Sequence, residues 1–234
     1  MSSIIESIAP NLYAYRGRFW TSCGQTALLF LIPGLISFVI GLLLGVILTV
    51  TRKDGIKPNR IAFRIVDAVI NVFRAIPFVI LLIFLIPFTR LLVGTSIGVR
   101  GAVVPLVFGT VPFYTRQVET VLVNLDKGKI EAARAMGTST IGIIFRVYLH
   151  EAVPELIRVT TITAISLVGL TTMAGAVGAG GIGSFAINYG QGQHHQDIVN
   201  ACVIVLLVVV CILQAIGALL ARKTTNRALF SRKR

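Results

Sequence analysis

The sequence predicts an all-helical integral membrane protein, and three observations support this class. Hydrophobic residues make up 55% of the 234 residues and charged residues only 13%, whereas about a quarter of a soluble domain is charged. Several uncharged runs reach the length of about 20 residues that a helix needs to cross a bilayer. The basic residues gather between these runs, as in the cytoplasmic loops of membrane proteins. We therefore expect one transmembrane domain over residues 1–234.

Five membrane spans are predicted from the order of apolar and charged segments. They cover about residues 23–50, 65–88, 102–123, 156–177 and 198–220. A backbone in lipid must satisfy its own hydrogen bonds, so each run is expected to cross as a helix.

The positions of Lys and Arg set the expected orientation. The segment between the first two spans carries Arg52, Lys53, Lys57, Arg60 and Arg64, so it should lie in the cytoplasm. The polar segment 124–151 and the tail after the fifth span then also lie inside, and the N-terminus outside. The basic residues of that tail are Arg222, Lys223, Arg227, Arg232, Lys233 and Arg234.

The formal net charge of +13 does not indicate nucleic-acid binding. The cations flank apolar runs and lack the interleaved aromatic residues of a single-strand binding groove. His194 and His195 have no convergent carboxylate or cysteine, so no metal site is predicted. No arrangement of Ser, His and Asp suits catalysis, so an enzyme is not predicted and no catalytic residue is assigned.

A glycine pattern in the chain formally matches a nucleotide-binding fingerprint. Gly178, Gly180 and Gly183 have the required spacing, but membrane spans flank them where the fingerprint needs strands and a helix. No Gly-x-x-x-x-Gly-Lys-Ser/Thr phosphate loop occurs either. The chain is therefore not expected to bind ATP by these routes, and an energy source must come from a partner.

The same small-residue passage, residues 169–183, follows the fourth span. Small residues let helices pack closely, and clustered glycines also permit a broken helix beside a cavity, so packing alone and a transport role both remain open. In a transporter the pathway would lie here, with Met173 as a flexible apolar plug and Thr171 or Thr172 beside it.

Asp67 and Arg74 are the ionisable residues nearest the second span. They lie two helical turns apart, so a direct pair is not assured. We expect Asp67 at the interface and Arg74 in a structural or snorkelling role.

The segment from Glu131 to Gly137 is charged and favours a helix. Its alanines are strong helix formers, Gly137 can end a helix in a left-handed cap, and Thr138 or Ser139 can begin another. Two short helices meeting at Gly137 are predicted. Such an elbow can present one helix to a partner protein, or it can be an ordinary amphipathic helix at the lipid headgroups.

The spacing around this elbow resembles the Glu-Ala-Ala loop of ATP-binding-cassette importer permeases. His150 stands where that family has Pro, and Pro154 is expected to provide the helix break instead. The matching residues are Glu131, Ala132, Ala133, Gly137, Val147 and Leu149.

The similarity extends over about residues 20–222 to the methionine-import permeases of bacteria. It is carried by residues 71–78, 86–90, 93–98, 126–128 and 173–176. The resemblance implies a homodimer in the inner membrane with two cytoplasmic ATPase subunits, which hold the ATP and Mg, and an external methionine-binding protein. It implies that this chain binds no cofactor.

The resemblance also implies that the elbow docks onto the ATPase, and that the cargo is methionine in its L or D form. Another amino acid as cargo, or a carrier or channel without an ATPase, remain the alternatives. The implied coupling residues are Glu131, Ala132, Ala133, Met136 and Gly137.

Overall fold

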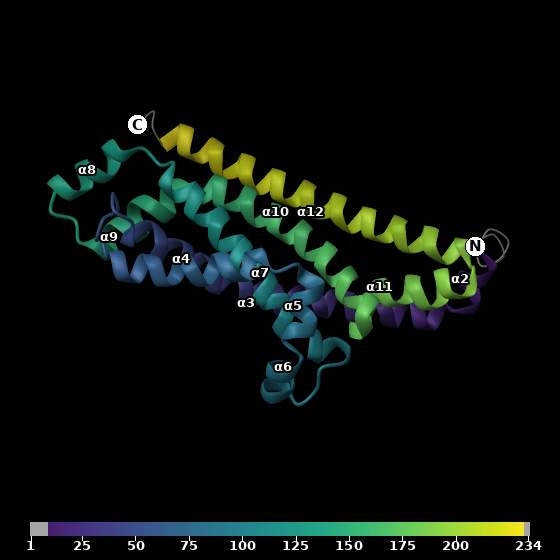
Figure 1. Ribbon diagram of the computed structural model, residues 1–234. Helices are drawn as coiled ribbons and strands as arrows, with labels where there is room; N and C mark the ends of the chain where they lie inside the picture. The colour runs from purple at the N-terminus through teal and green to yellow at the C-terminus, as the bar shows by residue number, and fades with distance from the viewer. Residues whose placement is uncertain (1–8, 232–234) are drawn as a thin grey trace. The chain divides into compact units, whose positions relative to one another are not determined.

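The computed structural model describes residues 9–231, with side chains through residue 225. Every regular element in that range is a helix (Figure 1), which confirms the predicted all-α class. The α-helices are α2 (Pro10–Ala14), α3 (Arg16–Thr51), α4 (Arg60–Ala75), α5 (Phe78–Phe84), α6 (Ile86–Val93), α7 (Gly98–Val123), α8 (Lys127–Ala135), α9 (Thr140–Ile143), α10 (His150–Ala174), α11 (Gly181–Phe185) and α12 (Gln196–Ser231). Wider π turns occupy Ile144–Leu149, Gly175–Ala179 and Ala186–Gly190, and a 3-10 turn occupies Gln191–Gln193.

Three helical segments are long and apolar enough to cross a membrane. They are Arg16–Thr51, Thr140–Ala179 and Gln196–Thr225. Two further pairs meet the same test only together, α4 with α5 at a bend of 105° and α6 with α7 at a bend of 119°. The described residues thus provide three candidate spans, or five if each bent pair is one span.

The second predicted span, residues 65–88, is divided among three helices. α4 ends at Ala75, and Pro77 has the extended backbone angles φ −56° and ψ 135° before α5 begins. Proline lacks an amide donor and disfavours a helical conformation of the residue before it, which explains a break here. α6 then begins at Ile86, with a proline in its first turn, where the missing donor is tolerated.

The other predicted spans fall within single helical segments. Residues 23–50, 102–123 and 198–220 lie inside α3, α7 and α12, and residues 156–177 run from α10 into the following π turn. In the basic tail, the Arg227 side chain and residues 232–234 lie outside the described part of the chain.

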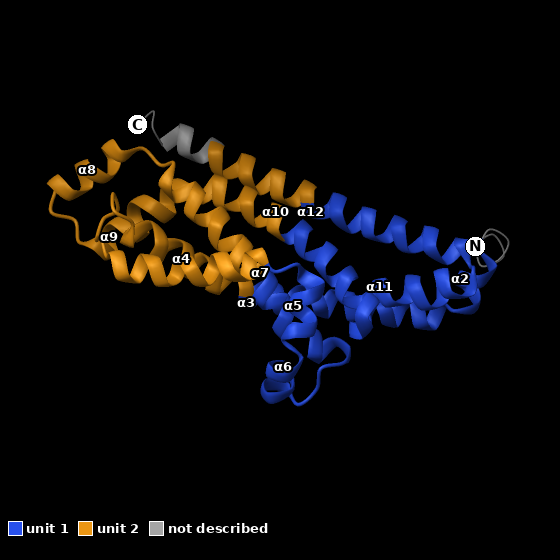
Figure 2. Cartoon of the chain, in the orientation of Figure 1, with its two compact units in different colours: residues 1–36, 76–109, 164–213 blue, residues 37–75, 110–163, 214–234 orange. Residues whose placement is uncertain are grey.

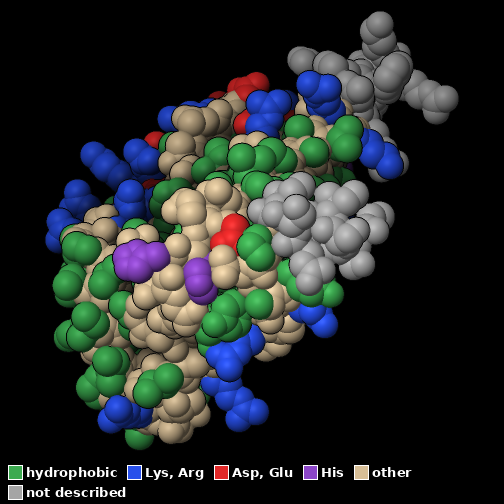
Figure 3. All heavy atoms as spheres, turned by 90° about the vertical axis from the view of Figure 1, so that its right-hand side faces the viewer, with side chains coloured by type: hydrophobic (Ala, Val, Ile, Leu, Met, Phe, Trp, Pro, Cys, Tyr) green, Lys and Arg blue, Asp and Glu red, His purple; other side chains and the backbone are tan. Residues whose placement is uncertain are grey.

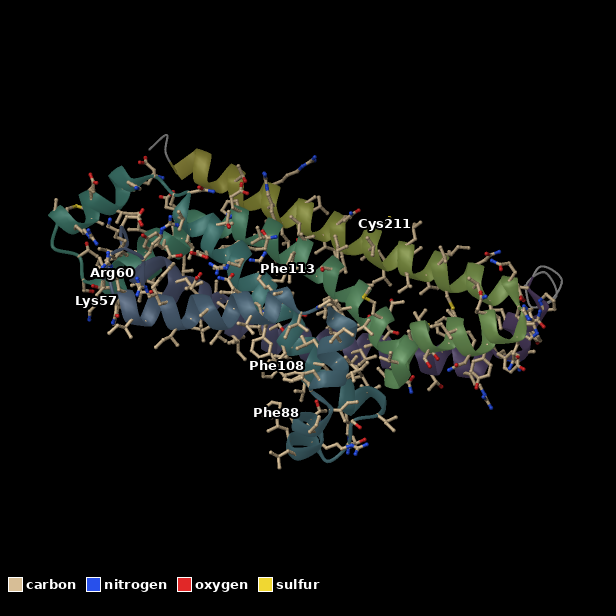
Figure 4. The ribbon with its side chains drawn as sticks, in the orientation of Figure 1. Lys57, Arg60, Phe88, Phe108, Phe113 and Cys211 are labelled. Atoms are coloured by element: carbon tan, nitrogen blue, oxygen red, sulfur yellow. The ribbon has the colours of Figure 1, made fainter. Side chains whose placement is uncertain are left out.

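The chain forms two compact units (Figure 2). Unit 1 comprises residues 1–36, 76–109 and 164–213, and unit 2 comprises residues 37–75, 110–163 and 214–234. Unit 1 has two apolar clusters, one around Leu29, Leu106 and Leu167 and one around Phe19 and Phe185. Within unit 1, Phe88 on α6 also contacts Phe108 on α7 edge to face, with ring centroids 5.8 Å apart (Figure 4).

Unit 2 contains the elbow and one continuous apolar core. Its buried members are Tyr114, Val118, Leu122, Ala133, Ile143, Tyr148, Ala152 and Val159. The core therefore joins α7, α8, α9 and α10, and it ties the short helices of the predicted cytoplasmic segment to the long ones.

Apolar side chains cover much of the surface. They are spread over the face drawn in Figure 3, and in the most apolar stretch of α12 only 6% of the residues are buried within the chain. A soluble protein rarely exposes large continuous apolar areas, because water penalises them. This surface fits a chain surrounded by lipid or by further membrane subunits.

Close packing of α3 on α7 in unit 2 depends on two glycines. A Cβ added at Gly41 would lie 2.7 Å from a ring carbon of Tyr114, and one at Gly45 would lie 2.5 Å from the Val118 side chain. Small residues at such contacts let membrane helices approach closely.

Gly45→Ala is therefore expected to lower the free energy of unfolding by about 1–3 kcal/mol, the usual effect of overpacking. Thermal unfolding of the purified protein in detergent measures this. Gly24→Ala is the matched control in the same helix, because no heavy atom lies within 4 Å of its added Cβ. Equal stability of the two variants would contradict the packing argument.

Candidate functional site

The elbow after α7 is formed by a glycine in a left-handed conformation. Gly137 has φ +74°, and its amide donates to the Arg134 carbonyl oxygen at 2.9 Å. The Thr138 amide donates to the Ala133 carbonyl oxygen at 3.1 Å. This pair of hydrogen bonds is the Schellman arrangement, which satisfies the last carbonyls of α8 and turns the chain sharply.

Side-chain caps fix the starts of both elbow helices. The Asp126 carboxylate accepts a hydrogen bond from the Gly128 amide at 2.9 Å, at the start of α8. The Ser139 hydroxyl accepts one from the Gly142 amide at 3.2 Å, at the start of α9. The predicted pair of short helices meeting at Gly137 is confirmed, and Ser139 is the residue that caps the second.

One face of α8 packs against the rest of unit 2. Ala133 is only 5% exposed and packs in the core that includes Tyr148. Lys129 forms an ion pair with Glu151 on α10. Of the implied coupling residues, Ala133 therefore anchors the elbow and does not face outward.

The opposite face of the elbow is exposed. Met136 is 78% exposed, and Ile141 and Phe145 are also exposed apolar side chains. Ala132 is exposed too, and the exposed Glu131 carboxylate makes no hydrogen bond or ion pair with any residue that the structure describes. These exposed apolar side chains are named here the elbow patch (Met136, Ile141 and Phe145), and Glu131 lines a cavity beside α8.

The helix break expected at Pro154 is absent, so that expectation is wrong. α10 begins at His150, with φ −66° and ψ −47°, and continues through Pro154. The irregularity lies earlier, in the π turn Ile144–Leu149. The buried residues Ala152 and Val159 hold α10 against the core on both sides of the proline, and tertiary packing overrides the local preference.

An ion cluster joins α4 to α7 within unit 2. The Arg116 guanidinium contacts the Asp67 carboxylate, donates to Glu119 at 2.7 Å and donates to the Asn71 side-chain oxygen at 2.8 Å. The side chains of Arg116, Asp67 and Glu119 are 20%, 31% and 10% exposed. Arg74 is exposed and pairs with no described residue, so the partner of Asp67 is Arg116.

Arg116 and Glu119 were not predicted from the sequence, although the pattern of α4 indicates a polar helix face that needs partners. Polar residues recur along α4 at helical spacing, at Arg60, Arg64, Asp67, Asn71 and Arg74. Residues so spaced share one face of a helix. Two of them contact Arg116, and the exposed apolar residues Ile61, Ile65, Val69 and Val72 recur on another face.

The expected pathway residues lie near the end of α10 in unit 1. Met173 is 50% exposed, whereas Thr171 is 2% exposed and its hydroxyl donates to the Val168 carbonyl oxygen at 2.7 Å. The Thr172 hydroxyl donates to the same oxygen at 3.1 Å. Of the three, Met173 alone presents a large part of its side chain at the surface.

The glycine-rich passage is broken and is held by polar side chains of α3, which the sequence reasoning also missed. Gly180 and Gly181 have positive φ, so the chain turns between the π turn and α11. The Gly181 amide donates to the Gln25 side-chain oxygen at 2.8 Å, and the Ile182 amide donates to the Thr26 hydroxyl at 2.8 Å. Gln25 and Thr26 thus satisfy two donors that a helix start leaves unpaired.

Among the side chains that the structure describes, no group of three or more His, Cys, Asp or Glu could hold a metal ion. The polar features of unit 2 are instead the elbow, the ion cluster and a cavity of about 80 Å³ beside α8. This cavity is lined in part by Thr49, Arg52, Asp54, Glu131, Arg134 and Tyr148.

A comparison with known families identifies the chain. Residues 37–226, which include the elbow, match the family described as binding-protein-dependent transport system inner membrane component. The chain belongs to this family. Its relatives are membrane permease subunits of importers, so the family is one of transport proteins.

Similar proteins are known from both sequence and structure. The chain is 41% identical over 207 residues to the probable D-methionine transport system permease protein MetI of Vibrio cholerae, covering 88% of this chain and 92% of the relative. It is 43% identical over 181 residues to the methionine import system permease protein MetP of Bacillus subtilis, covering 77% and 82%. A solved structure of the MetNI methionine ABC transporter in an inward-facing conformation is 42% identical, with a TM-score of 0.85, covering 92% and 98%.

Asp67→Asn in this permease is expected to lower the free energy of unfolding by about 1–3 kcal/mol, because hydrogen bonds to charged groups contribute about that much. Thermal unfolding in detergent measures the change. Arg74→Gln, on the same face of α4 but without a described partner, is expected to leave stability unchanged. A larger loss of unfolding free energy from Arg74→Gln than from Asp67→Asn would contradict the assignment of Arg116, and not Arg74, as the partner of Asp67.

Proposed function

We propose that this chain is the permease subunit of an ATP-driven importer that translocates methionine, in its L or D form, across the bacterial inner membrane. The observation that carries the proposal is the elbow. It combines a rigid glycine turn, an attached inner face and an exposed apolar patch with a free carboxylate. The family match and the methionine permeases among the relatives support the direction and the cargo.

In this proposal the elbow is seated in a groove of a cytoplasmic ATPase subunit. Glu131, Ala132 and Met136 face the ATPase, Gly137 sets the angle between the elbow helices, and Ala133 ties the lever to the core. ATP and Mg bind to the ATPase, and this chain binds no cofactor. An apolar patch beside a charge is the usual composition of a helix that docks into a protein groove.

The proposed assembly is a homodimer of five-span subunits with two ATPase subunits and an external binding protein. In this assembly each bent helix pair counts as one span, and the basic loops support an N-terminus outside and a C-terminus in the cytoplasm. The exposed apolar surface supports further membrane contacts for each copy.

The proposed pathway passes Met173, which gates it as a flexible apolar side chain, while Thr171 and Thr172 shape the helix beside it. The positive φ angles of Gly178, Gly180 and Gly181 allow the chain next to the gate to change direction. Alternating access then follows from a rigid-body movement that starts at the elbow.

Gly137→Val is expected to uncouple transport from ATP hydrolysis, because a branched residue is strained at φ +74° while no atom within 4 Å obstructs it. Uptake and ATP hydrolysis are measured together on the complex in liposomes. Gly137→Asn is the matched control, because Asn tolerates the left-handed conformation and should retain most coupling. Unchanged uptake per ATP in the valine variant would count against a lever at this position.

The wild-type chain is expected to co-purify with its ATPase and to take up methionine only with ATP and the binding protein. Competition by unlabelled L-methionine, D-methionine and other amino acids identifies the cargo. Uptake inhibited equally by an unrelated amino acid would favour a different cargo. Transport by the chain alone would favour a carrier or channel.

A further inference from the structure

The loop between α3 and α4, residues 52–59, contacts both ends of α8. The Arg134 guanidinium, near the end of α8, donates to the carbonyl oxygens of Ile56 at 2.6 Å and Gly55 at 3.2 Å. The Lys127 ammonium, at the start of α8, lies 3.6 Å from the Asp54 carboxylate. Attachment at two points fixes the orientation of α8 relative to this loop.

The two attachments differ in strength. A guanidinium that donates to two carbonyl oxygens forms charge-assisted hydrogen bonds, which are stronger than neutral ones. The pair of Lys127 and Asp54 is exposed, and such pairs contribute little. The pKa of Asp54 is lowered, mainly because its carboxylate accepts a hydrogen bond from the Asp54 backbone amide. The charges of Arg52 and Lys127 also lower this pKa, whereas desolvation raises it. Arg134 makes the closer attachment, with two hydrogen bonds at 2.6 and 3.2 Å against one ion pair at 3.6 Å.

The loop is fixed to the end of α3. Its Gly55 amide donates to the Arg52 carbonyl, and its Lys57 and Asn59 amides donate to the carbonyls of Val50 and Thr51, at 2.9, 3.1 and 2.9 Å. A Cβ added at Gly55 would lie 2.5 Å from the backbone oxygens of both Thr49 and Val50. The Gly55 backbone therefore packs directly against the end of α3, with no room for a side chain.

The same loop begins α4. The Asn59 side-chain oxygen accepts hydrogen bonds from the Ile61 and Ala62 amides, both at 3.1 Å, as an N-cap does. Lys57 and Arg60 mark the end of the loop and the start of α4 in Figure 4. Further along α4, Asp67 contacts Arg116 of α7. Hydrogen bonds and ion pairs therefore run without interruption from α8 through the loop to α3, α4 and α7.

We propose that the α3–α4 loop receives the displacement of α8 and passes it to α3 and α4, and that Arg134 is the positioning residue that holds the two together. This inference deepens the proposed function, since it rests on an ATPase moving the elbow. Ala133 packs on the core through one small side chain, whereas Arg134 binds the backbone of another segment. A chain of rigid, hydrogen-bonded elements can carry such coupling.

Arg134→Ala, tested in the full complex in liposomes, is expected to retain co-purification with the ATPase and ATP hydrolysis, while methionine uptake per ATP falls about tenfold, within the range of known coupling effects. Arg134→Lys should recover part of the ratio, because one charged donor can still reach a carbonyl. Lys53→Ala is the matched control, since Lys53 is an exposed cation of the same loop without a described partner.

Gly55→Ala tests the other side of the contact and should lower the same ratio, because the added Cβ displaces the carbonyls that Arg134 binds. A wild-type ratio in Arg134→Ala or in Gly55→Ala overturns the inference, and so does loss of ATPase binding in Arg134→Ala, which would make Arg134 a docking residue. If Arg134→Ala is not inserted at the wild-type level, Arg134→Gln is measured in its place. A wild-type chain that fails to bind any ATPase would overturn the proposed function itself, a different outcome.

Discussion

The backbone's need for hydrogen bonds in an apolar environment governs this structure. At two helix breaks, replacement partners satisfy the backbone groups that the break frees. Gln25 and Thr26 accept from the amides at the start of α11, and the loop after α3 donates to the carbonyls at that helix's end. Without such partners each exposed group would cost several kcal/mol in lipid, roughly the margin of stability of a domain.

Backbone hydrogen bonds are also satisfied within the elbow, and this leaves its outer face free for a partner. The amides of Gly137 and Thr138 donate to the Arg134 and Ala133 carbonyl oxygens near the end of α8. These carbonyls need no partner from another protein, so the outer face of the elbow can present side chains. The inner face is tied by Ala133 to the core and by Arg134 to the loop after α3. A lever needs both properties, because a free outer face binds the partner and a fixed inner face transmits the movement.

Charge inside the apolar part of unit 2 is arranged in a comparable way. Burying a charged guanidinium in an apolar region costs free energy, and Arg116 offsets this cost by contacting two carboxylates and an amide oxygen from two helices. The contact of Arg116 with Asp67 fixes the register of α4 on α7. Together with the Asn59 cap, it makes α4 a firmly held element between the loop and the span beside it.

The helical class, the apolar segments, the elbow at Gly137 and the permease resemblance could all be predicted from the sequence, because these depend on local composition and spacing. The sequence did not determine that residues 65–88 are divided by bends or that α10 continues through Pro154, because packing decides whether a proline breaks a helix. The partner of Asp67, the burial of Thr171 and the hydrogen bonds of Arg134 to the Gly55 and Ile56 carbonyls became known from the packed helices alone. The Asp67 and Arg134 contacts join residues 49 or more positions apart, and no local pattern specifies which distant groups will meet.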